Sequence, residues 1–201
     1  MRVIGITGGV GAGKSAVLDH LAQTYNCRVI KADQAAHQLE EPGGACFEPL
    51  VALLGAEILD AAGRIDRQKM AARIFADSGL LQRVNDIVHP AVKKYLLSEI
   101  AKERESGKRD FLFIEAALLI EEGYAEIVDG LWYIRADETA RRQRLKESRG
   151  YPDEKIEAIL RSQLSDEDFL KHCALVIENN GTLASVYEQI EKELGEDQWQ
   201  K

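Results

Sequence analysis

One stretch of eight residues constrains the fold of this 201-residue chain more than any other feature. Residues 8–15 read Gly-Gly-Val-Gly-Ala-Gly-Lys-Ser and fit the pattern G-x-x-x-x-G-K-[ST] at every fixed position. The apolar run 2–6 before them predicts a buried strand, and the spacing of Val17, Leu18 and Leu21 after them predicts a helix. The alternative is a glycine-rich turn that binds nothing, which the flanking strand and helix disfavour.

Such a loop suits phosphate groups for a physical reason. Glycines let the backbone curl so that its N–H groups point inward, and the N-terminus of the next helix adds about half a unit of positive charge. We therefore expect a nucleoside triphosphate here, with Lys14 reaching its β- and γ-phosphates and the Ser15 hydroxyl ligating Mg²⁺. The predicted nucleotide-binding residues are Gly9, Gly11, Ala12, Gly13, Lys14, Ser15 and Ala16.

Further short apolar runs predict a sheet. They lie at residues 27–30, 111–114, 131–134 and 175–177 and alternate with helical segments, which indicates an α/β fold with parallel strands. We predict a P-loop NTPase fold, with three layers (α/β/α) around a mostly parallel five-stranded sheet. The chain 1–201 is expected to form a single domain, whose core covers about 1–40, 108–136 and 173–195.

Two helical stretches interrupt the alternation and are interpreted as insertions over the active site. The first, about 41–107, is the predicted acceptor region, and the second, about 137–172, is the predicted lid. Pro90 suits the first turn of a helix, so the first stretch is expected to end in separate helices. The helices expected in the two stretches cover 50–59, 67–76, 79–87, 90–105, 137–148 and 153–164, and others are expected at 34–40 and 183–194.

The composition excludes several classes of protein. A net charge of −8 argues against a nucleic-acid-binding protein, which usually carries a basic face, whereas a phosphate-bearing small molecule needs only a local positive site. No stretch approaches the about 20 apolar residues of a membrane span, and residues 1–9 reach glycine too soon for a secretory signal. We therefore expect no membrane partner and a cytoplasmic location. The three cysteines form no CxxC pair, and the four histidines lack metal-ligand spacing.

Among P-loop proteins, a small-molecule kinase fits best. A GTPase would need an N-K-x-D motif, which is absent, and no strand leads into the D-x-x-G pattern at 60–63. The arginine-rich segment 141–149 favours a kinase, because arginines on a lid neutralise the charge on a transferred phosphoryl group. A solvated helix with i,i+4 ion pairs explains the same segment equally well.

Beyond the loop, blocks along residues 3–190 resemble the dephospho-CoA kinase family. They lie at residues 4–15, 29–39, 63–67, 84–92, 163 and 176–181. The P-loop is generic, but the ordered set is specific, above all the stretch through His89 and Pro90. There are departures. Residues 115–117 read Glu-Ala-Ala where the family commonly has D-x-P, residues 141–145 read Arg-Arg-Gln-Arg-Leu where it has Q-x-x-R-L, and Cys173-Ala174 replace an A-D pair.

The resemblance implies transfer of the γ-phosphoryl group of ATP to the ribose 3′-hydroxyl of dephospho-CoA, giving CoA and ADP, the last step of coenzyme A synthesis. It implies Asp33 as general base, with Lys14 and Arg144 as the other catalytic residues, and Asn179 beside the adenine. The implied acceptor-binding residues are Asp33, His37, Arg67, His89 and Glu115. From the residues alone, Asp33 fits equally well as a helix N-cap, and Asn179 as a turn residue.

Two other functions stay open at this point. One is another small-molecule P-loop kinase, such as a nucleoside or nucleotide kinase. The other is a nucleotide-dependent switch without turnover. The expected partners are ATP and dephospho-CoA, bound by a monomer or a weak homo-oligomer.

Overall fold

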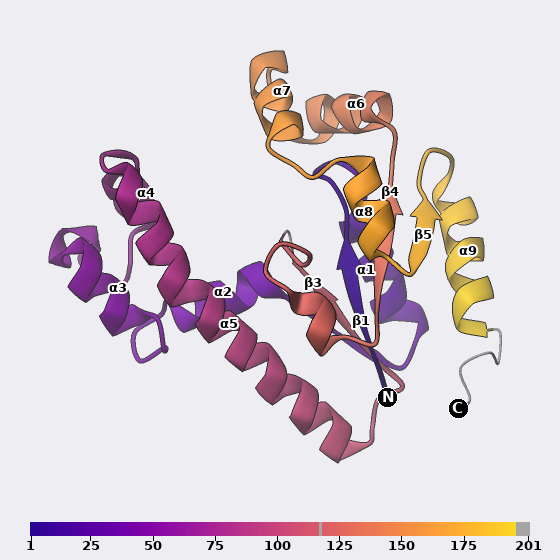
Figure 1. Ribbon diagram of the computed structural model, residues 1–201, viewed down its shortest axis with the longest axis horizontal. Coiled ribbons are helices and arrows are strands. Elements are labelled where there is room, and N and C mark those ends of the chain that lie inside the picture. The colour runs from indigo at the N-terminus through magenta and orange to yellow at the C-terminus, as the bar shows by residue number, and fades with distance from the viewer. Residues whose placement is uncertain (117, 196–201) are drawn as a thin grey trace. The chain divides into compact units, whose positions relative to one another are not determined.

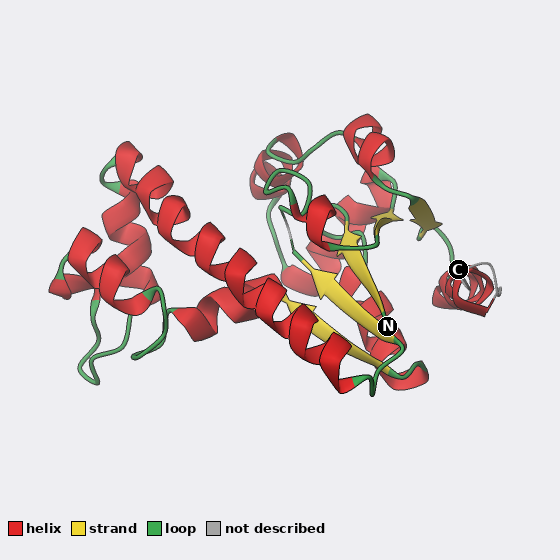
Figure 2. Cartoon of the chain, turned by 60° about the horizontal axis from the view of Figure 1, so that its bottom comes forward, coloured by secondary structure: helices red, strands yellow, loops and turns green. Residues whose placement is uncertain are grey.

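The chain folds around one parallel sheet. The computed structural model describes residues 1–116 and 118–195, with the side chain of Ser78 left out. In this part of the chain five strands pair in the order β2-β3-β1-β4-β5 (Figures 1 and 2). This confirms the predicted α/β fold, and the sheet is parallel throughout. The strands are β1 (Arg2–Thr7), β2 (Cys27–Lys31), β3 (Phe111–Glu115), β4 (Gly130–Arg135) and β5 (Leu175–Glu178).

Helices connect these strands, and most lie where the sequence predicts them. The α-helices are α1 (Lys14–Thr24), α2 (Ala32–Leu39), α3 (Phe47–Leu54), α4 (Arg67–Phe75), α5 (Ser78–Ser106), α6 (Glu138–Arg149), α7 (Asp153–Arg161), α8 (Asp166–His172) and α9 (Leu183–Gly195). Two short 3-10 helices, η1 (Ala56–Ile58) and η2 (Tyr124–Ile127), complete the set in the described residues. None of these helices combines the length and apolar character that a membrane span needs.

The prediction of separate helices at 79–87 and 90–105 is wrong. The structure has one helix, α5, with Pro90 inside it. A proline in a helix interior costs about 3 kcal/mol, because it removes a hydrogen bond and crowds the preceding turn. Pro90 is exposed, so its ring lies away from a buried stripe that recurs every four or eight residues. This stripe holds the helix together across the proline, and its members are Leu80, Val84, Val92, Leu96 and Ile100.

Smaller corrections concern helix ends. The expected helix 50–59 begins earlier and stops at Leu54, because Gly55 adopts a φ of 92° and only η1 follows. The expected helix 153–164 ends at Arg161, and α8 is a separate helix that the sequence did not predict. Finally, α2 begins at Ala32, so Asp33 lies inside its first turn and is not its N-cap.

The chain divides into two compact units. The first is Met1–Val29 with the described part of Ser106–Lys201, and it carries most of the sheet. The second, Ile30–Glu105, has a small core of its own, in which α3 and α5 pack together. The fully or nearly buried members of that core are Cys46, Leu50, Leu54, Ile58, Leu80 and Val84.

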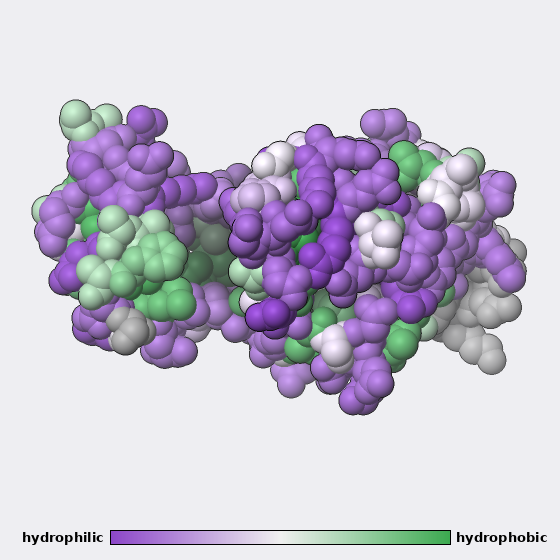
Figure 3. All heavy atoms as spheres, turned by 90° about the horizontal axis from the view of Figure 1, so that it is seen from above, coloured by the Kyte–Doolittle hydropathy of each residue, from purple (hydrophilic) through white to green (hydrophobic). Residues whose placement is uncertain are grey.

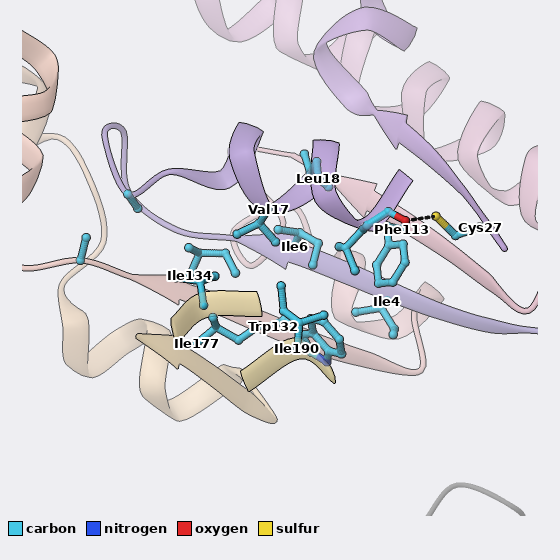
Figure 4. Close-up of a cluster of buried hydrophobic side chains, with 14 residues drawn as sticks. Ile4, Ile6, Val17, Leu18, Cys27, Phe113, Trp132, Ile134, Ile177 and Ile190 are labelled. Carbon is cyan, nitrogen blue, oxygen red and sulfur yellow. Dashed lines mark hydrogen bonds between the residues drawn. The ribbon is translucent and has the colours of Figure 1, made fainter. Parts of the chain in front are cut away.

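Helices cover both faces of the sheet in the first unit, which gives the predicted three layers. On one face, alternate residues of β1 and β4 pack against α1 and α9 (Figure 4). The residues in this contact include Ile4, Ile6, Trp132, Ile134, Val17, Leu18 and Ile190. On the other face, the ring of Tyr133 stacks on Phe169 of α8 at a centroid distance of 4.5 Å. The Tyr133 hydroxyl also donates a 2.6 Å hydrogen bond to Asp166, at the start of α8.

Candidate active site

The P-loop runs from the end of β1 to the start of α1. Its turn is closed by a 3.1 Å hydrogen bond from the Ala12 amide to the Gly9 carbonyl. Gly13 is the N-cap of α1 with a φ of 95°, a conformation that side chains disfavour. A Cβ atom on Gly13 would also clash with the side-chain amide of Asn179. Position 13 therefore needs glycine both for its backbone conformation and for space.

The amides of the loop are arranged to hold an anion. Among the residues that the structure describes, none accepts a hydrogen bond from the amides of Gly11, Gly13 or Ser15. Donors at the N-terminus of a helix, where the dipole of α1 adds positive charge, favour phosphate oxygens. Among the described residues these three amides are therefore available donors, and their binding of phosphate stays a prediction.

Lys14 lies beside this cradle. Its ammonium donates a 2.7 Å hydrogen bond to the Gly8 carbonyl, and its Nζ lies 3.9 Å from the carboxylate of Glu115. The two side chains are only 14% and 17% exposed. Glu115 ends β3, whose register places it opposite Ile6 of β1. The parallel pairing of β1 and β3 thus brings the predicted acceptor residue Glu115 next to Lys14.

Asn179 contacts the loop directly. It follows β5, is 2% exposed, and donates a 2.7 Å hydrogen bond to the Ala12 carbonyl. Its own backbone carbonyl accepts a 2.8 Å hydrogen bond from Arg144 of α6. The same guanidinium lies 3.5 and 3.4 Å from the carbonyl oxygens of Gly11 and Ala12. Asn179 therefore supports the P-loop, and its expected place beside adenine stays a prediction.

A second arginine of α6 reaches the other half of the loop. The Nε of Arg141 donates a 3.0 Å hydrogen bond to the Val10 carbonyl, and its Nη2 donates to the Oε1 of Gln163. That same oxygen accepts a 3.2 Å hydrogen bond from the Val10 amide. The guanidinium packs so closely on Gly9 that a Cβ there would clash with it. Burial lowers the pKa of Arg141, while the nearby Tyr133 and acidic side chains oppose this shift.

Arginines of α6 also make solvent-exposed ion pairs, as the alternative interpretation of segment 141–149 predicts. Arg142 donates a 2.7 Å hydrogen bond to Glu138 one turn earlier and also pairs with Glu157 of α7. Lys146 lies 2.7 Å from Asp153. The surface seen in Figure 3 is accordingly mostly hydrophilic. Both interpretations of segment 141–149 therefore apply to α6. Arg141 and Arg144 contact the P-loop, and Arg142 forms solvent-exposed ion pairs.

Three of the predicted acceptor residues come together in the second unit. Partial desolvation and the charge of Arg67 lower the pKa of His37, and Asp33 opposes the shift. Arg67 lies 3.9 Å from Glu40, whose side chain is 13% exposed. Burial raises the pKa of Glu40, and Arg67 opposes that shift. Arg67 therefore interacts with both Glu40 and His37, and Asp33 interacts with His37.

His89 lies in α5 next to Pro90, in the same unit as these acceptor residues.

The D-x-x-G pattern at 60–63 is a turn, in which the carboxylate of Asp60 accepts hydrogen bonds of 2.8 and 2.9 Å from the amides of Ala62 and Arg64. This agrees with the exclusion of a GTPase, because the aspartate is occupied by its own turn.

Two residues of these sites were missed from the sequence. The sequence predicts no role for Gln163 beyond its place in a family block, and it predicts none for Glu40. The contact between Gln163 and Val10 spans 153 residues, and no local pattern predicts it. For Glu40, a signal was present in its position three residues after His37, which places it at the C-cap of the helix that carries Asp33 and His37.

Comparisons with known proteins agree with this geometry. The family model described as dephospho-CoA kinase matches residues 2–185. A dephospho-CoA kinase from Streptococcus agalactiae is 34% identical over 191 residues, which cover 94% of this chain and 95% of that protein. One from Corynebacterium diphtheriae is 34% identical over 201 residues, covering 100% and 97% of the two chains.

Solved structures share the fold. A crystal structure from Thermus thermophilus superposes with a TM-score of 0.79 at 29% identity, covering 98% of this chain and 97% of that one. A dephospho-CoA kinase from Campylobacter jejuni gives a TM-score of 0.73 at 20% identity, with 96% of each chain covered. The sequence matches, which span nearly the whole chain, decide the family: this chain belongs to the dephospho-CoA kinases.

Proposed function

We propose that this protein transfers the γ-phosphoryl group of ATP to the ribose 3′-hydroxyl of dephospho-CoA, giving CoA and ADP. The observation that carries the proposal is the P-loop, whose amides at Gly11, Gly13 and Ser15 have no acceptor in the described part of the chain and lie at the N-terminus of α1 with Lys14. Membership of the dephospho-CoA kinase family supports the choice of acceptor.

The nucleotide side of the reaction needs positioning and charge stabilisation. Lys14 holds the β- and γ-phosphates, and the amides of Gly11, Gly13 and Ser15 hold the remaining oxygens. Arg144 already contacts the loop carbonyls, and its charge is close enough to the cradle to stabilise the transferred group. Glu115, 3.9 Å from Lys14, orients the lysine by attracting its ammonium group.

The acceptor side needs a base for the 3′-hydroxyl. Asp33 takes its proton while the ribose oxygen bonds to the γ-phosphorus, and the bond to the β–γ bridging oxygen breaks, so that ADP leaves. Asp33 is exposed and interacts with His37, which also feels the charge of Arg67, and this supports a role in binding a phosphate-bearing acceptor there. His89 is proposed to contribute to the same acceptor region.

Mg²⁺ is proposed to bind with the triphosphate. The hydroxyl of Ser15 is exposed in the first turn of α1, and one protein hydroxyl suits an ion that keeps most of its water and phosphate ligands. In the described residues no group of three or more acidic, histidine or cysteine side chains offers a metal site. The ion would neutralise charge on the phosphates.

The direct test is to incubate the pure protein with ATP, Mg²⁺ and dephospho-CoA and to measure CoA by mass. An analogue that lacks the 3′-hydroxyl should give no product, and Lys14→Ala should lower kcat/KM at least about 100-fold. Nucleosides and nucleotides run as parallel acceptors. Phosphorylation of one of these in preference to dephospho-CoA, or slow hydrolysis with no phosphorylated acceptor, would contradict the proposal. A cytoplasmic location and a monomeric or weakly associating state stay predictions of the sequence.

A further inference from the structure

A side chain outside the predicted site, Gln163, holds the P-loop in place. Its Oε1 accepts hydrogen bonds from the Val10 amide at 3.2 Å and from the guanidinium of Arg141. Both partners can only donate, so the oxygen end of the amide must face them. Arg141 in turn donates to the Val10 carbonyl at 3.0 Å. Val10 is therefore held at both its N–H and its C=O, within a closed ring of three residues.

This ring acts on the turn that shapes the phosphate cradle. Val10 lies between Gly9 and Ala12, whose backbone hydrogen bond of 3.1 Å closes the turn. The partners of Val10 occupy its amide and carbonyl, while the amides of Gly11 and Gly13 stay available among the described residues. Fixing Val10 thus limits the directions in which the next donors can point, and preorganised donors bind an anion more tightly than mobile ones.

Gln163 is itself anchored to the sheet. It lies between α7 and α8, and the hydroxyl of Ser165 two residues later caps α8 by accepting a 3.2 Å hydrogen bond from the Asp168 amide. The helix α8 is attached to β4 through the stacked rings of Phe169 and Tyr133. The oxygen that holds Val10 is therefore supported by the rigid core of the first unit.

We propose that Gln163 is a positioning residue for the triphosphate. Its Oε1 accepts hydrogen bonds from both Val10 and Arg141 and so fixes the conformation of the P-loop that binds the phosphates. The inference rests on the nucleotide half of the proposed function and is independent of the acceptor. It predicts that loss of the Gln163 oxygen weakens nucleotide binding while leaving the acceptor step largely unchanged.

The test compares Gln163→Leu, Gln163→Ala and Gln163→Glu. Leucine and alanine remove the acceptor oxygen, whereas glutamate keeps an oxygen that accepts from both donors. Gln163 borders a pocket of about 410 Å³ that Leu160 and Leu164 also line, which leaves room for a leucine. Gln143→Leu is the matched control, because Gln143 is exposed on α6 and its side chain bonds only to Glu147 among residues 1–116 and 118–195.

Calorimetry with ATP and ADP in the presence of Mg²⁺, without acceptor, gives the main readout. We expect Kd to rise about tenfold for Gln163→Leu and Gln163→Ala, the scale of one hydrogen bond with a charged partner. Gln163→Glu and Gln143→Leu should stay within about threefold of the wild type on the same scale. In turnover assays the KM for ATP should rise, with kcat and the KM for the acceptor nearly constant.

Two results would overturn the inference. One is nucleotide affinity in Gln163→Leu and Gln163→Ala equal to that of the wild type. The other is a loss in Gln163→Glu as large as in these variants, which would mean that the position matters for packing and not for its acceptor oxygen. A wild-type protein that binds ATP but makes no CoA would contradict the proposed function and leave this inference intact.

Discussion

The side-chain amide of Asn179 donates a 2.7 Å hydrogen bond to the backbone carbonyl of Ala12. The two residues are 167 positions apart in the sequence, and both are buried. The bond therefore joins the end of the last strand, β5, to the P-loop at the start of the chain. The P-loop is hydrogen-bonded both to Asn179 after β5 and to arginines of α6. Its conformation therefore depends on the packing of these elements in the folded protein.

Asn179→Ala should lower the free energy of unfolding by about 1–3 kcal/mol, because it leaves the buried Ala12 carbonyl without its best donor. Asn179→Asp should cost more, since a carboxylate would then face a carbonyl oxygen. Urea unfolding measures both. Asn180→Ala is the control, because Asn180 is exposed and should cost less than about 1 kcal/mol. Equal losses at the two positions would argue against the contact.

Asp33→Asn tests the proposed general base. The amide keeps the size of the side chain but cannot accept the proton, so kcat should fall by about 10²–10⁴-fold. The affinity for ATP, measured by calorimetry, should change little. Asp19→Asn, at an exposed position of α1, serves as the control. Turnover within a few-fold of the wild type would remove Asp33 from this role.

Glu40, whose side chain is 13% exposed, gives a prediction about pH. Burial raises its pKa in the folded protein, so the fold favours the protonated form. Its contribution to stability is fully present below the ordinary pKa of about 4.3 and is lost as the pH rises through the raised value. Glu40→Gln, which stays neutral, should therefore raise Tm at pH 7 relative to the wild type.

Thermal melts from pH 4 to pH 8 measure this effect. The difference between Glu40→Gln and the wild type should amount to a few degrees at pH 7, since about 1 kcal/mol corresponds to about 2–4 °C in a chain of this size. It should shrink toward pH 4. The exposed Glu48→Gln should show no such trend. A difference of the opposite sign would mean that the ion pair with Arg67 outweighs the burial of Glu40.

Tyr133→Phe removes the hydroxyl that donates to Asp166 at 2.6 Å and leaves the stacked ring in place. We expect a loss of about 1 kcal/mol and a Tm lower by about 2–4 °C. Burial alone would raise the pKa of Asp166, but hydrogen bonds from Tyr133 and Arg135 lower it overall. This stabilisation is present above the ordinary pKa of about 3.9 and is lost as the pH falls through the lowered value.

The loss of stability in Tyr133→Phe should therefore be larger at pH 7 than at pH 3. Tyr187→Phe keeps a ring that stacks on His20 and is the matched control. If both variants lose the same stability at every pH, the contact between Tyr133 and Asp166 contributes nothing specific.

The parts of the fold that local patterns determine were predictable. The run 2–6, the glycines of 8–13 and the apolar spacing after Ser15 specify β1, the P-loop and α1 one after another. The continuity of α5 through Pro90 was not predictable in this way. Local preference for a helix start competes there with burial of the stripe from Leu80 to Ile100. Leu80 and Val84 of this stripe pack into the core of the second unit, which exists only in the folded protein.

Residues of the candidate site, too, were predictable from the sequence only where a local pattern specifies them. Lys14 was expected at the loop, and the parallel pairing of β1 and β3 explains why Glu115 lies beside it. Gln163 was not expected to have a role, because its contact with Val10 depends on the folding of α7 and α8 over a sheet formed elsewhere in the chain. Contacts of this kind follow from the topology and not from any short motif.

The arginines of α6 recognise the P-loop through its main chain. Arg141 and Arg144 bond to the carbonyls of residues 10, 11 and 12, and neither relies on a side chain of the loop. A change of side chain at Val10 that keeps the backbone path leaves these bonds intact, and Val10 is partly exposed. Position 10 is therefore the place in the loop where a cysteine could carry a fluorescent label that reports nucleotide binding.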